Sequence, residues 1–474
     1  MGRILFLQNQ TFAYPGIYYI CGALKARGHE YRVLLAADRQ AVSEHIRKER
    51  PHLVAFPCLT GIHKDVLASA REIKAQFPDL PVVLGNVHPT LFPEILQQPE
   101  VDYLCRGEGE FPTCELLEAL ERGEHPTDIP NISWKDSAGA LHHNEMRPLV
   151  DPLDDLPFPD YSVYKDIPVV HNDTYPMVFM TRGCPFNCTY CHNSNQRKVY
   201  KGKGRYVRTF SVGRILDEVE SARANYPHTT AVLLGADTLG SDVEWLTELL
   251  TSYRRRFPEL PYTCLIRPEF ISESMARLLG STGCYMIAFG VESGSERVRK
   301  ELLRRPYTNE QLVAAAQRLR ENGIKFRTYN IIGFPGETGR EMWETLAINQ
   351  KIRPDFPWCS IFTPYPETKL AEIAQEQGYL SPNFTYDDVP ASFFNDTILQ
   401  NVDRNRILNL HAFFQTLVLY PWLTPLVRPL LLLPHNPVFR LWFKAVYAWI
   451  CLKSENRSLF SFAKLALANR KLFK

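Results

Sequence analysis

Several features that would point to particular classes of protein are missing from this sequence of 474 residues. The formal net charge is only +2, so the chain lacks the basic excess with which nucleic-acid binders neutralise phosphates. Its eleven cysteines are odd in number and unevenly spaced, which argues against a disulfide framework and for a reducing compartment. No uninterrupted apolar run reaches the roughly 20 residues of a membrane-spanning helix. We therefore expect a cytoplasmic protein that does not bind nucleic acid.

Three short motifs are also missing, and each absence excludes a kind of site. The first turn after a strand, QNQTFAYPG (8–16), lacks the GxGxxG pattern of dinucleotide-binding domains. No acidic pocket follows that strand, which argues against a receiver-type regulatory domain. The cysteines form no second CxxC pair of the kind that completes a four-ligand zinc site.

Short apolar runs alternate with helical segments in two stretches of the chain. The first stretch predicts a parallel, doubly wound Rossmann-like sheet, and the second predicts a partial (β/α)6 barrel, so the fold class is α/β. In both folds ligands bind beyond the carboxyl ends of the strands. The expected strands are 4–8, 31–36, 52–57, 81–85 and 102–105, then 176–183, 231–237, 262–268, 285–293, 326–334 and 358–366.

Composition sets the expected domain boundaries. The proline-rich and acidic segment 151–164 predicts a linker that reaches about residue 170, after a small β excursion over 125–150. We divide the chain into an N-terminal domain (1–150), a core domain (171–380) and an α-helical C-terminal region (381–474). A helix over 295–303 is among those expected in the core domain.

Three cysteines stand together in TRGCPFNCTYC, directly after the first strand of the second stretch. Cys184, Cys188 and Cys191 offer three thiolates where zinc would want four ligands. An iron-sulfur cube held by three thiolates keeps one iron open for a substrate or cofactor. Zinc binding and buried free thiols are the alternatives. Tyr190 adds an aromatic ring that would lie against the adenine of a bound nucleotide.

The run TRGCPFNCTYC resembles the cluster loop of radical S-adenosylmethionine enzymes. GVESGSERV (290–298), IIGFPGET (331–338) and TPYPET (363–368) are similar to strings in that family. The resemblance implies a [4Fe-4S] cluster on the three cysteines, S-adenosylmethionine on its open iron, and an external electron donor of the flavodoxin or ferredoxin type. It also implies cofactor contacts from four residues, which are Tyr190, Asp237, Glu292 and Ser293.

Two residues depart from the family pattern. Asp237 in LLGAD stands where many members have a Gly-Gly-Glu turn, so it either takes that role or caps the next helix. Glu292 and Ser293 have the comparable alternative of solvated caps. Glu367 stands where glycine is expected, which predicts a differently shaped turn.

The first domain resembles the cobalamin-binding domain that precedes the barrel in one large class of these enzymes, which includes class B methylases and the anaerobic magnesium-protoporphyrin ester cyclase. The strings that carry the resemblance are VVLGNVHPT (82–90), VDYLCRGEGE (101–110) and LDDLPFPD (153–160). Asn86 in the first string replaces a glycine, so we expect the backbone there to approach the cofactor less closely.

The DxHxxG signature of domains that ligate cobalt through histidine is absent, because TGIHKD lacks its aspartate and glycine. The resemblance then implies base-off cobalamin without a protein histidine ligand. Thr60 and His63, in a loop that begins at Cys58, would approach the lower face of the cofactor, while Gly85 and His88 would support its nucleotide tail. For His63, cobalt ligation and a plain helix N-terminal or surface histidine are both open.

The C-terminal region combines apolar and basic residues. The apolar run 413–437 is broken by prolines and by Arg428, and residues 440–474 hold eight basic residues against one acid, Glu455. This composition predicts a peripheral surface at the inner face of a membrane, or else a segment packed over the barrel mouth. A hydrophobic or lipid-like small-molecule substrate fits both.

Together these features predict a cobalamin-dependent radical S-adenosylmethionine enzyme. We expect a C-methyltransferase that acts on an unactivated carbon of a hydrophobic or secondary-metabolite substrate. The alternatives are a cyclase, ring-rearranging or hydroxylating enzyme with the same cofactors, and a cobalamin-binding sensor or carrier. No general base or substrate motif can be assigned from the sequence.

Overall fold

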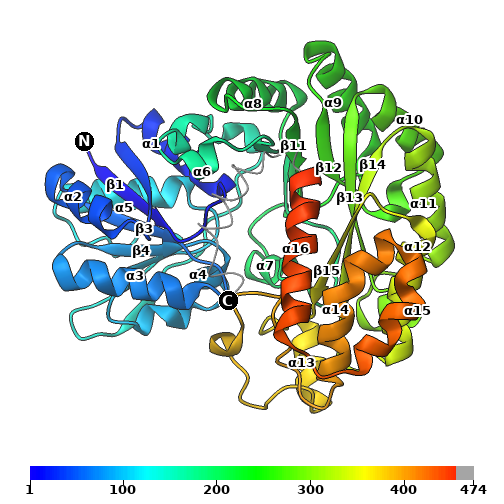
Figure 1. Ribbon diagram of the computed structural model, residues 1–474. Coiled ribbons are helices and arrows are strands. Elements are labelled where there is room, and N and C mark those ends of the chain that lie inside the picture. The colour runs from blue at the N-terminus through cyan, green and yellow to red at the C-terminus, as the bar shows by residue number, and fades with distance from the viewer. Residues whose placement is uncertain (455–474) are drawn as a thin grey trace. The chain divides into compact units, whose positions relative to one another are not determined.

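The structure, a computed structural model, describes residues 1–454 (Figure 1). The chain divides into two compact units. Unit 1 contains Met1–Asp173 and Asn195–His228, and unit 2 contains Thr174–Ser194 and the chain from Thr229 onward. The basic residues and the acid expected beyond residue 454 lie outside the described residues.

Unit 1 is built on a seven-stranded sheet with the strand order β2-β1-β3-β4-β5-β6-β7. The first five strands in chain order pair in parallel, which confirms the predicted doubly wound sheet. The last two are antiparallel and account for the β excursion expected over 125–150. These strands are β1 (Arg3–Gln8), β2 (Glu30–Leu35), β3 (Leu53–Pro57), β4 (Val82–Gly85), β5 (Tyr103–Cys105), β6 (Ile132–Lys135) and β7 (Leu141–His143).

The helices of unit 1 follow the predicted alternation. Buried apolar side chains of α2 and α3 pack with those of β1, β3 and β4 in one core. The helices are α1 (Pro15–Ala26), α2 (Arg39–Glu49), α3 (His63–Gln76), α4 (Val87–Leu91), α5 (Glu110–Glu121), α6 (Pro168–His171) and α8 (Val212–Asn225), and a short strand, β10, covers Arg208–Thr209. Helix α7 (Asn193–Val199) spans the change from unit 2 to unit 1.

The proline-rich segment 151–164 is irregular, but it belongs to the packed interior of unit 1. Tyr161 is fully buried and its hydroxyl donates to Glu218 of α8, 3.2 Å away. Tyr19 of α1 donates to the same carboxylate at 2.8 Å. The backbone of the segment also touches α1, because a Cβ atom added at Gly22 would lie 2.0 Å from the carbonyl oxygen of Phe158. The segment is thus held against α1 and α8.

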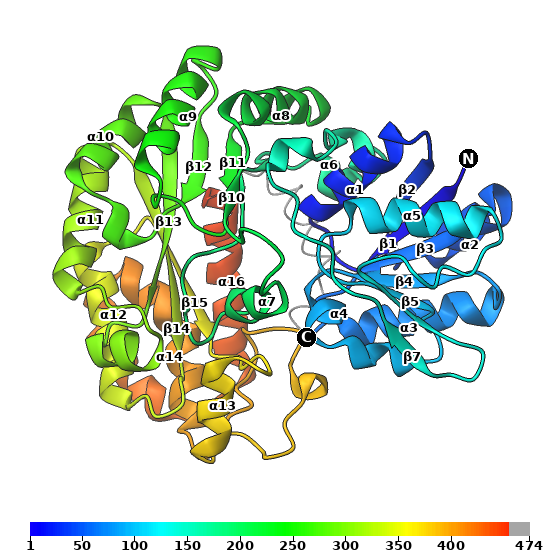
Figure 2. The same cartoon turned by 180° about the vertical axis from the view of Figure 1, so that it is seen from behind.

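Unit 2 contains a six-stranded sheet in the order β15-β14-β13-β12-β11-β8, with every neighbouring pair parallel. This arrangement confirms the predicted partial barrel, and in Figure 2 helices follow one another along its outer side. The strands are β8 (Met177–Phe179), β11 (Val232–Gly235), β12 (Tyr262–Leu265), β13 (Cys284–Glu292), β14 (Lys325–Ile332) and β15 (Phe356–Ile361), with a short β9 (Thr181–Arg182) outside the sheet.

The barrel helices are α9 (Val243–Arg256), α10 (Glu273–Ser281), α11 (Asn309–Glu321), α12 (Gly339–Ile352) and α13 (Lys369–Glu376). Capping boxes at Thr308 and Thr338 fix the starts of α11 and α12. The helix expected over 295–303 is confirmed over residues 296–302, of which Val298–Leu302 form a π-helix. Its buried arginine, Arg299, donates to the carbonyl oxygen of Ser293 at 2.6 Å, and this contact folds the chain back on itself.

The C-terminal helices are α14 (Arg404–Leu419), α15 (Thr424–Val427) and α16 (Pro437–Ser454). The middle of α14 is buried along the edge strand β15, where His411 lies 3.1 Å from the carbonyl oxygen of Cys359 and Gln415 donates to that of Pro357 at 3.3 Å. The C-terminal helical region therefore packs against the edge of the sheet at β15. Within residues 1–454, no helix has the length and hydrophobicity to cross a membrane.

The two glycines of α1 give a matched test of the packing around segment 151–164. Gly22→Ala places a methyl group against the Phe158 carbonyl, and we expect it to lower the free energy of unfolding by about 1 to 3 kcal/mol. Gly16 has no neighbouring atom within 4 Å, so Gly16→Ala should be neutral or slightly stabilising. Denaturant unfolding of both variants measures the difference, and equal effects would contradict the tight contact.

Candidate cofactor sites

The cysteine loop leaves the carboxyl edge of the six-stranded sheet, directly after β8 and β9. Cys188 is buried, Cys184 and Cys191 are partly buried, and none of the three forms a disulfide. The backbone N–H of Cys191 donates to the carbonyl oxygen of Cys188 at 3.2 Å. The predicted position of the loop, at the carboxyl ends of the strands, is confirmed.

The Asp237 carboxylate holds the two ends of this loop. One oxygen accepts a hydrogen bond from the backbone N–H of Gly183 at 2.8 Å, and the other accepts from the side chain of Asn193 at 3.3 Å. Asp237 follows β11, the neighbour of β8 in the sheet. The alternative of a helix cap is wrong, because Asp242 caps α9 instead. Asp237 thus connects the residue before Cys184 with a residue two positions after Cys191.

The middle of the cysteine loop is held by contacts of Thr189 with the chain after β13 and with α13. The Thr189 hydroxyl donates to the carbonyl oxygen of Leu302 at 2.5 Å. The Thr189 carbonyl accepts from the backbone N–H of Leu370, the second residue of α13, at 2.9 Å. Because a loop has few hydrogen bonds of its own, these contacts fix where its thiols lie.

Burial affects the protonation of the loop thiols. Burial raises the pKa of Cys191 to about 12, so this thiol is protonated at neutral pH, and coordination to iron would deprotonate it. The Arg267 guanidinium donates to the Cys188 sulfur at 3.7 Å and stacks over the Phe186 ring at 3.7 Å.

Within the described part of the chain, no three His, Cys, Asp or Glu side chains converge to hold a single metal ion. A cube of four irons and four sulfides is larger than one ion, so its thiolate ligands stand apart around it. Three unpaired thiols on one loop fit a three-thiolate cluster better than the closed four-ligand shell of zinc. The cluster assignment of Cys184, Cys188 and Cys191 remains a prediction.

A buried arginine connects two of the predicted cofactor residues. Arg305 donates to the Tyr190 hydroxyl at 3.0 Å and pairs with the Glu292 carboxylate at 3.1 Å. Glu292 ends β13 with a left-handed backbone (φ 60°) and is buried, so the alternative of a solvated cap is wrong for it. Sequence reasoning missed Arg305, because an arginine before a proline belongs to no motif. The contacts of Tyr190 and Glu292 with S-adenosylmethionine stay predictions.

Ser293 is fully buried, so it is not a solvated cap either. Its hydroxyl oxygen accepts a hydrogen bond from the backbone N–H of Ser295 at 3.2 Å and lies 3.4 Å from the Thr345 hydroxyl. The next residue, Gly294, packs directly on α12, where an added Cβ would lie 2.2 Å from the carbonyl oxygen of Glu344. The chain after β13 is therefore clamped to α12.

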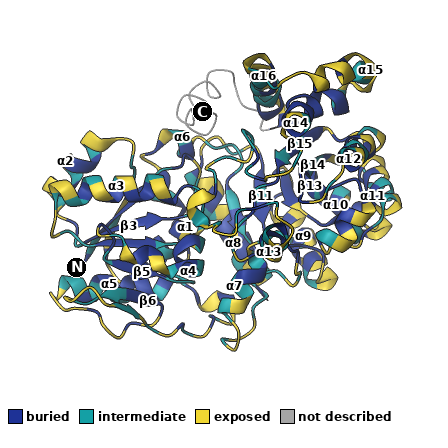
Figure 3. Ribbon diagram, turned by 90° about the horizontal axis from the view of Figure 1, so that it is seen from below, coloured by how far each residue is buried: buried dark blue, intermediate teal, exposed yellow. Residues whose placement is uncertain are grey.

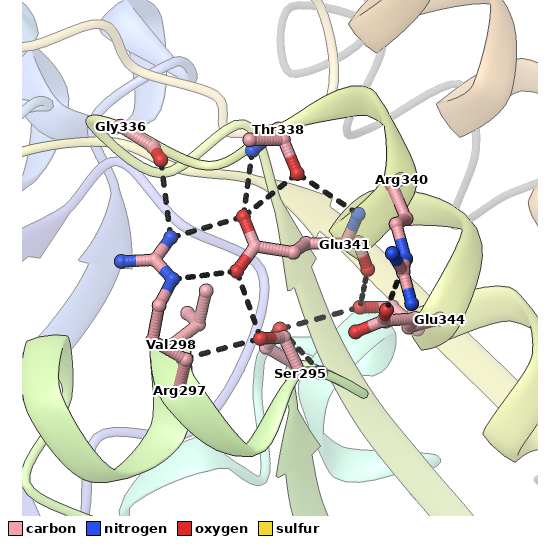
Figure 4. A network of polar contacts seen from close by, with 10 residues as sticks. Ser295, Arg297, Val298, Gly336, Thr338, Arg340, Glu341 and Glu344 are labelled. Carbon is pink, nitrogen blue, oxygen red and sulfur yellow. Dashed lines mark hydrogen bonds and ion pairs between the residues drawn. The ribbon is translucent and has the colours of Figure 1, made fainter.

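A polar network around Glu341 strengthens this clamp (Figure 4). Arg297 forms two hydrogen bonds to the Glu341 carboxylate, at 2.7 and 2.9 Å, and Ser295 donates a third at 2.9 Å. Burial opposes ionisation, but these bonds and those from Thr338 hold the pKa of Glu341 at about 2. The network joins the loops after β13 and β14 at the edge where the cysteine loop also begins.

Glu337 is a second carboxylate at this edge, and sequence reasoning assigned it no role. Its carboxylate oxygen accepts from the backbone N–H groups of Gly333 and Phe334 at 2.7 and 3.1 Å. Burial nevertheless raises the pKa of Glu337 to about 8, so at neutral pH it is largely neutral. Its place in the quoted string IIGFPGET was the available signal.

Glu367, in the last motif, has φ 62°, in the region that favours glycine, and the differently shaped turn stays a prediction.

In unit 1, the four predicted cobalamin residues come together at the carboxyl ends of β3 and β4. The Thr60 hydroxyl lies 3.0 Å from Nδ1 of His88. The His63 and His88 rings stack with centroids 4.6 Å apart. Gly85, at the end of β4, accepts a hydrogen bond from the backbone N–H of Cys58 at 2.8 Å. The geometry brings these residues together, and their contact with cobalamin stays a prediction.

Both histidines of this group are fully buried. His63 is the first residue of α3, so the helix N-terminal position is confirmed and the surface position is wrong. Burial, helped by the neighbouring His63, lowers the pKa of His88 to about 3, so its ring is neutral. Asn86 has φ 83°, the region that favours glycine, so the backbone there keeps a glycine-like course.

Comparison with known proteins agrees with both sites. The family described as B12 binding domain matches residues 10–117, and the Radical SAM superfamily matches residues 178–347. An uncharacterized methyltransferase, PH0819 of Pyrococcus horikoshii, is 28% identical over 76% of this chain and 78% of its own length.

Two further similarities extend over most of the chain. The anaerobic magnesium-protoporphyrin IX monomethyl ester cyclase of Rubrivivax gelatinosus is 25% identical over 76% of this chain and 66% of the cyclase. The solved structure of the cobalamin-dependent S-adenosylmethionine radical enzyme OxsB, with aqua-cobalamin and S-adenosylmethionine bound, aligns with a TM-score of 0.71. It covers 98% of this chain and 72% of OxsB at 14% identity, which shows a common fold.

The two family matches fall on the two predicted sites: the histidine cluster lies within the first and the cysteine loop within the second. The cofactors that these domains imply are a [4Fe-4S] cluster, S-adenosylmethionine and cobalamin. The chain thus carries a B12-binding domain ahead of a radical S-adenosylmethionine domain.

Proposed function

We propose that this chain is a C-methyltransferase that uses cobalamin and radical S-adenosylmethionine chemistry on an unactivated carbon of a hydrophobic or secondary-metabolite molecule. The observation that carries the proposal is the presence, in one chain, of a three-cysteine loop at the carboxyl edge of the radical domain and a B12-binding domain. Similarity to a protein named as a methyltransferase over 76% of this chain supports methyl transfer.

When bound, the cluster and S-adenosylmethionine supply a 5′-deoxyadenosyl radical that removes a substrate hydrogen, and cobalamin supplies the methyl group. The three loop cysteines would hold the cluster. Arg267 donates a hydrogen bond to the Cys188 sulfur, a contact of the kind that tunes cluster potentials. Asp237 keeps the loop ends in place.

In unit 1, the predicted cobalamin residues Thr60 and His88 have neutral side chains that can form hydrogen bonds. Because its pKa is about 3, His88 stays neutral at physiological pH and offers one donor and one acceptor. Thr60 occupies Nδ1 of that ring, which fixes the ring's orientation. His63 stacks on His88 and limits its rotation. Because both rings are fully buried, they would fix the shape of the loop, and the partly exposed Thr60 would contact the cofactor.

A second candidate function uses the same cofactors without methyl transfer. The similarity to the magnesium-protoporphyrin ester cyclase, over 76% of this chain, favours a cyclase or another ring-forming or hydroxylating reaction. A cobalamin-binding sensor or carrier is the candidate outside enzymology. We also propose a cytoplasmic location and an external flavodoxin-type or ferredoxin-type electron donor, because the cluster must receive an electron before the radical can form.

Replacement of one loop cysteine tests the cluster assignment. Cys188→Ala should abolish iron retention and 5′-deoxyadenosine formation in protein reconstituted anaerobically with iron, sulfide and S-adenosylmethionine under a chemical reductant. Cys114→Ala, which changes a buried cysteine of α5, is the control and should keep both. A Cys188→Ala protein with full iron content and cleavage activity would overturn the assignment. If the unsubstituted protein binds cobalamin but forms no 5′-deoxyadenosine, the sensor is favoured.

The role of Asp237 can be tested with two substitutions of different severity. Asp237→Ala removes both contacts with the loop ends, and we expect about tenfold weaker retention of the cluster, with an altered electron paramagnetic resonance spectrum. Asp237→Asn keeps an acceptor for Gly183 and should lie between that variant and the unsubstituted protein. Asp242→Ala, which removes only the cap of α9, should leave the spectrum unchanged. An unchanged spectrum in Asp237→Ala would contradict the role.

Labelling separates the methyltransferase from the cyclase. Reconstituted holoprotein is incubated with methyl-deuterated S-adenosylmethionine and a small-molecule extract of its source cells, and products are followed by mass spectrometry. Methyl transfer predicts a product that contains the labelled methyl group. A product that forms only with the holoprotein and contains no label would instead support the cyclase.

A further inference from the structure

The last described helix, α16, is apolar on two opposite sides. Phe439, Phe443 and Ile450 are buried, and they pack with α14 or with the neighbouring sheet. Val438 and Leu441 point the other way and are 71% and 68% exposed. A surface helix normally has one apolar face, which packs on the core, and polar residues on the other. Within residues 1–454, the second apolar side of α16 has no cover.

The chain between α14 and α16 adds to the same kind of surface. Trp422 is 70% exposed, Leu426 67% and Leu432 77%. Figures 1 and 3 show α15 and α16 flanking α14 on the outside of unit 2, with exposed residues along both. We name the set the C-terminal apolar surface, and its members are Trp422, Leu426, Leu432, Val438 and Leu441.

The charge of this region is of one sign. No aspartate or glutamate occurs between Asp403 and Glu455. Two basic residues of this stretch, Arg404 and Arg406, pair with Asp396 and Asp403. The other basic residues are Arg428, Arg440, Lys444 and Lys453. The Lys453 ammonium group lies 4.4 Å from the centre of the Trp449 ring, which is a cation–π contact. Apolar side chains between basic ones match the boundary between lipid headgroups and acyl chains.

We propose that the C-terminal apolar surface docks on a phospholipid bilayer that carries anionic lipid. Trp422 and the leucines enter the headgroup boundary, and the basic residues contact lipid phosphates. A second copy of this chain fits the surface less well, because a symmetric interface would bring the basic residues of two α16 helices together, and α16 contains no aspartate or glutamate. The proposal concerns location and does not rest on the proposed reaction.

Vesicle sedimentation with the full chain tests the proposal. We expect the protein to sediment with vesicles of phosphatidylcholine and phosphatidylglycerol and to bind phosphatidylcholine alone more weakly. The triple variant Trp422→Ser, Leu432→Ser, Leu441→Ser should bind at least about tenfold more weakly. Lys444→Gln with Lys453→Gln should lose about fivefold per charge on anionic vesicles only. High salt should weaken binding to the anionic vesicles.

The control for apolar exposure is Val243→Ser, which changes a 54% exposed residue of α9 and should leave vesicle binding unchanged. Thermal unfolding of the triple variant should match that of the unsubstituted protein, which separates lost docking from lost folding. Binding of the triple variant at full strength, or no binding by the unsubstituted protein, would overturn the proposal. So would a concentration-dependent dimer in light scattering that the triple variant abolishes, because a second copy would then cover the surface.

Discussion

The constraint on which the radical domain depends is that an irregular loop must present three thiols in fixed positions without a hydrogen-bond ladder of its own. Buried backbone groups of such a loop need partners elsewhere. Here Asp237 accepts from the residues that flank the cysteines, while Leu302 and Leu370 hold Thr189 between them. All of these partners follow strands of one parallel sheet. Parallel strand order is therefore what brings distant chain segments to one loop.

The same edge also carries two carboxylates in opposite protonation states. Glu341 is ionised by its hydrogen bonds with Arg297, Ser295 and Thr338, and it ties the turn after β13 to α12. Glu337, a few residues away in sequence, is kept neutral by burial. The charge of Glu341 is balanced by Arg297, and Glu337 carries no charge. The edge of the sheet is therefore polar, but these carboxylates add no net negative charge where an anionic cluster would bind.

Much of this arrangement could be predicted from the sequence, because periodic apolar runs report strands and helices and because the cysteine loop has an unusual spacing. Individual contacts could not be predicted. Arg305 contacts both Glu292 and Tyr190, and Tyr190 lies more than a hundred residues earlier in the chain. No local sequence pattern predicts such a pairing. The same holds for the buried state of His63. Asn86 and Glu367 have φ values of 83° and 62°, in the region that favours glycine, and no local sequence pattern indicates this.

The division of the chain into units has a consequence for protein engineering. Unit 1 is completed by residues 195–228, which follow the cysteine loop, and α8 in that stretch supplies Glu218 to the tyrosines of α1 and segment 151–164. Unit 1 can therefore not be exchanged as a single contiguous cassette. A working chimaera would have to transplant both pieces at once, although the residues that match the B12-binding family form one continuous stretch.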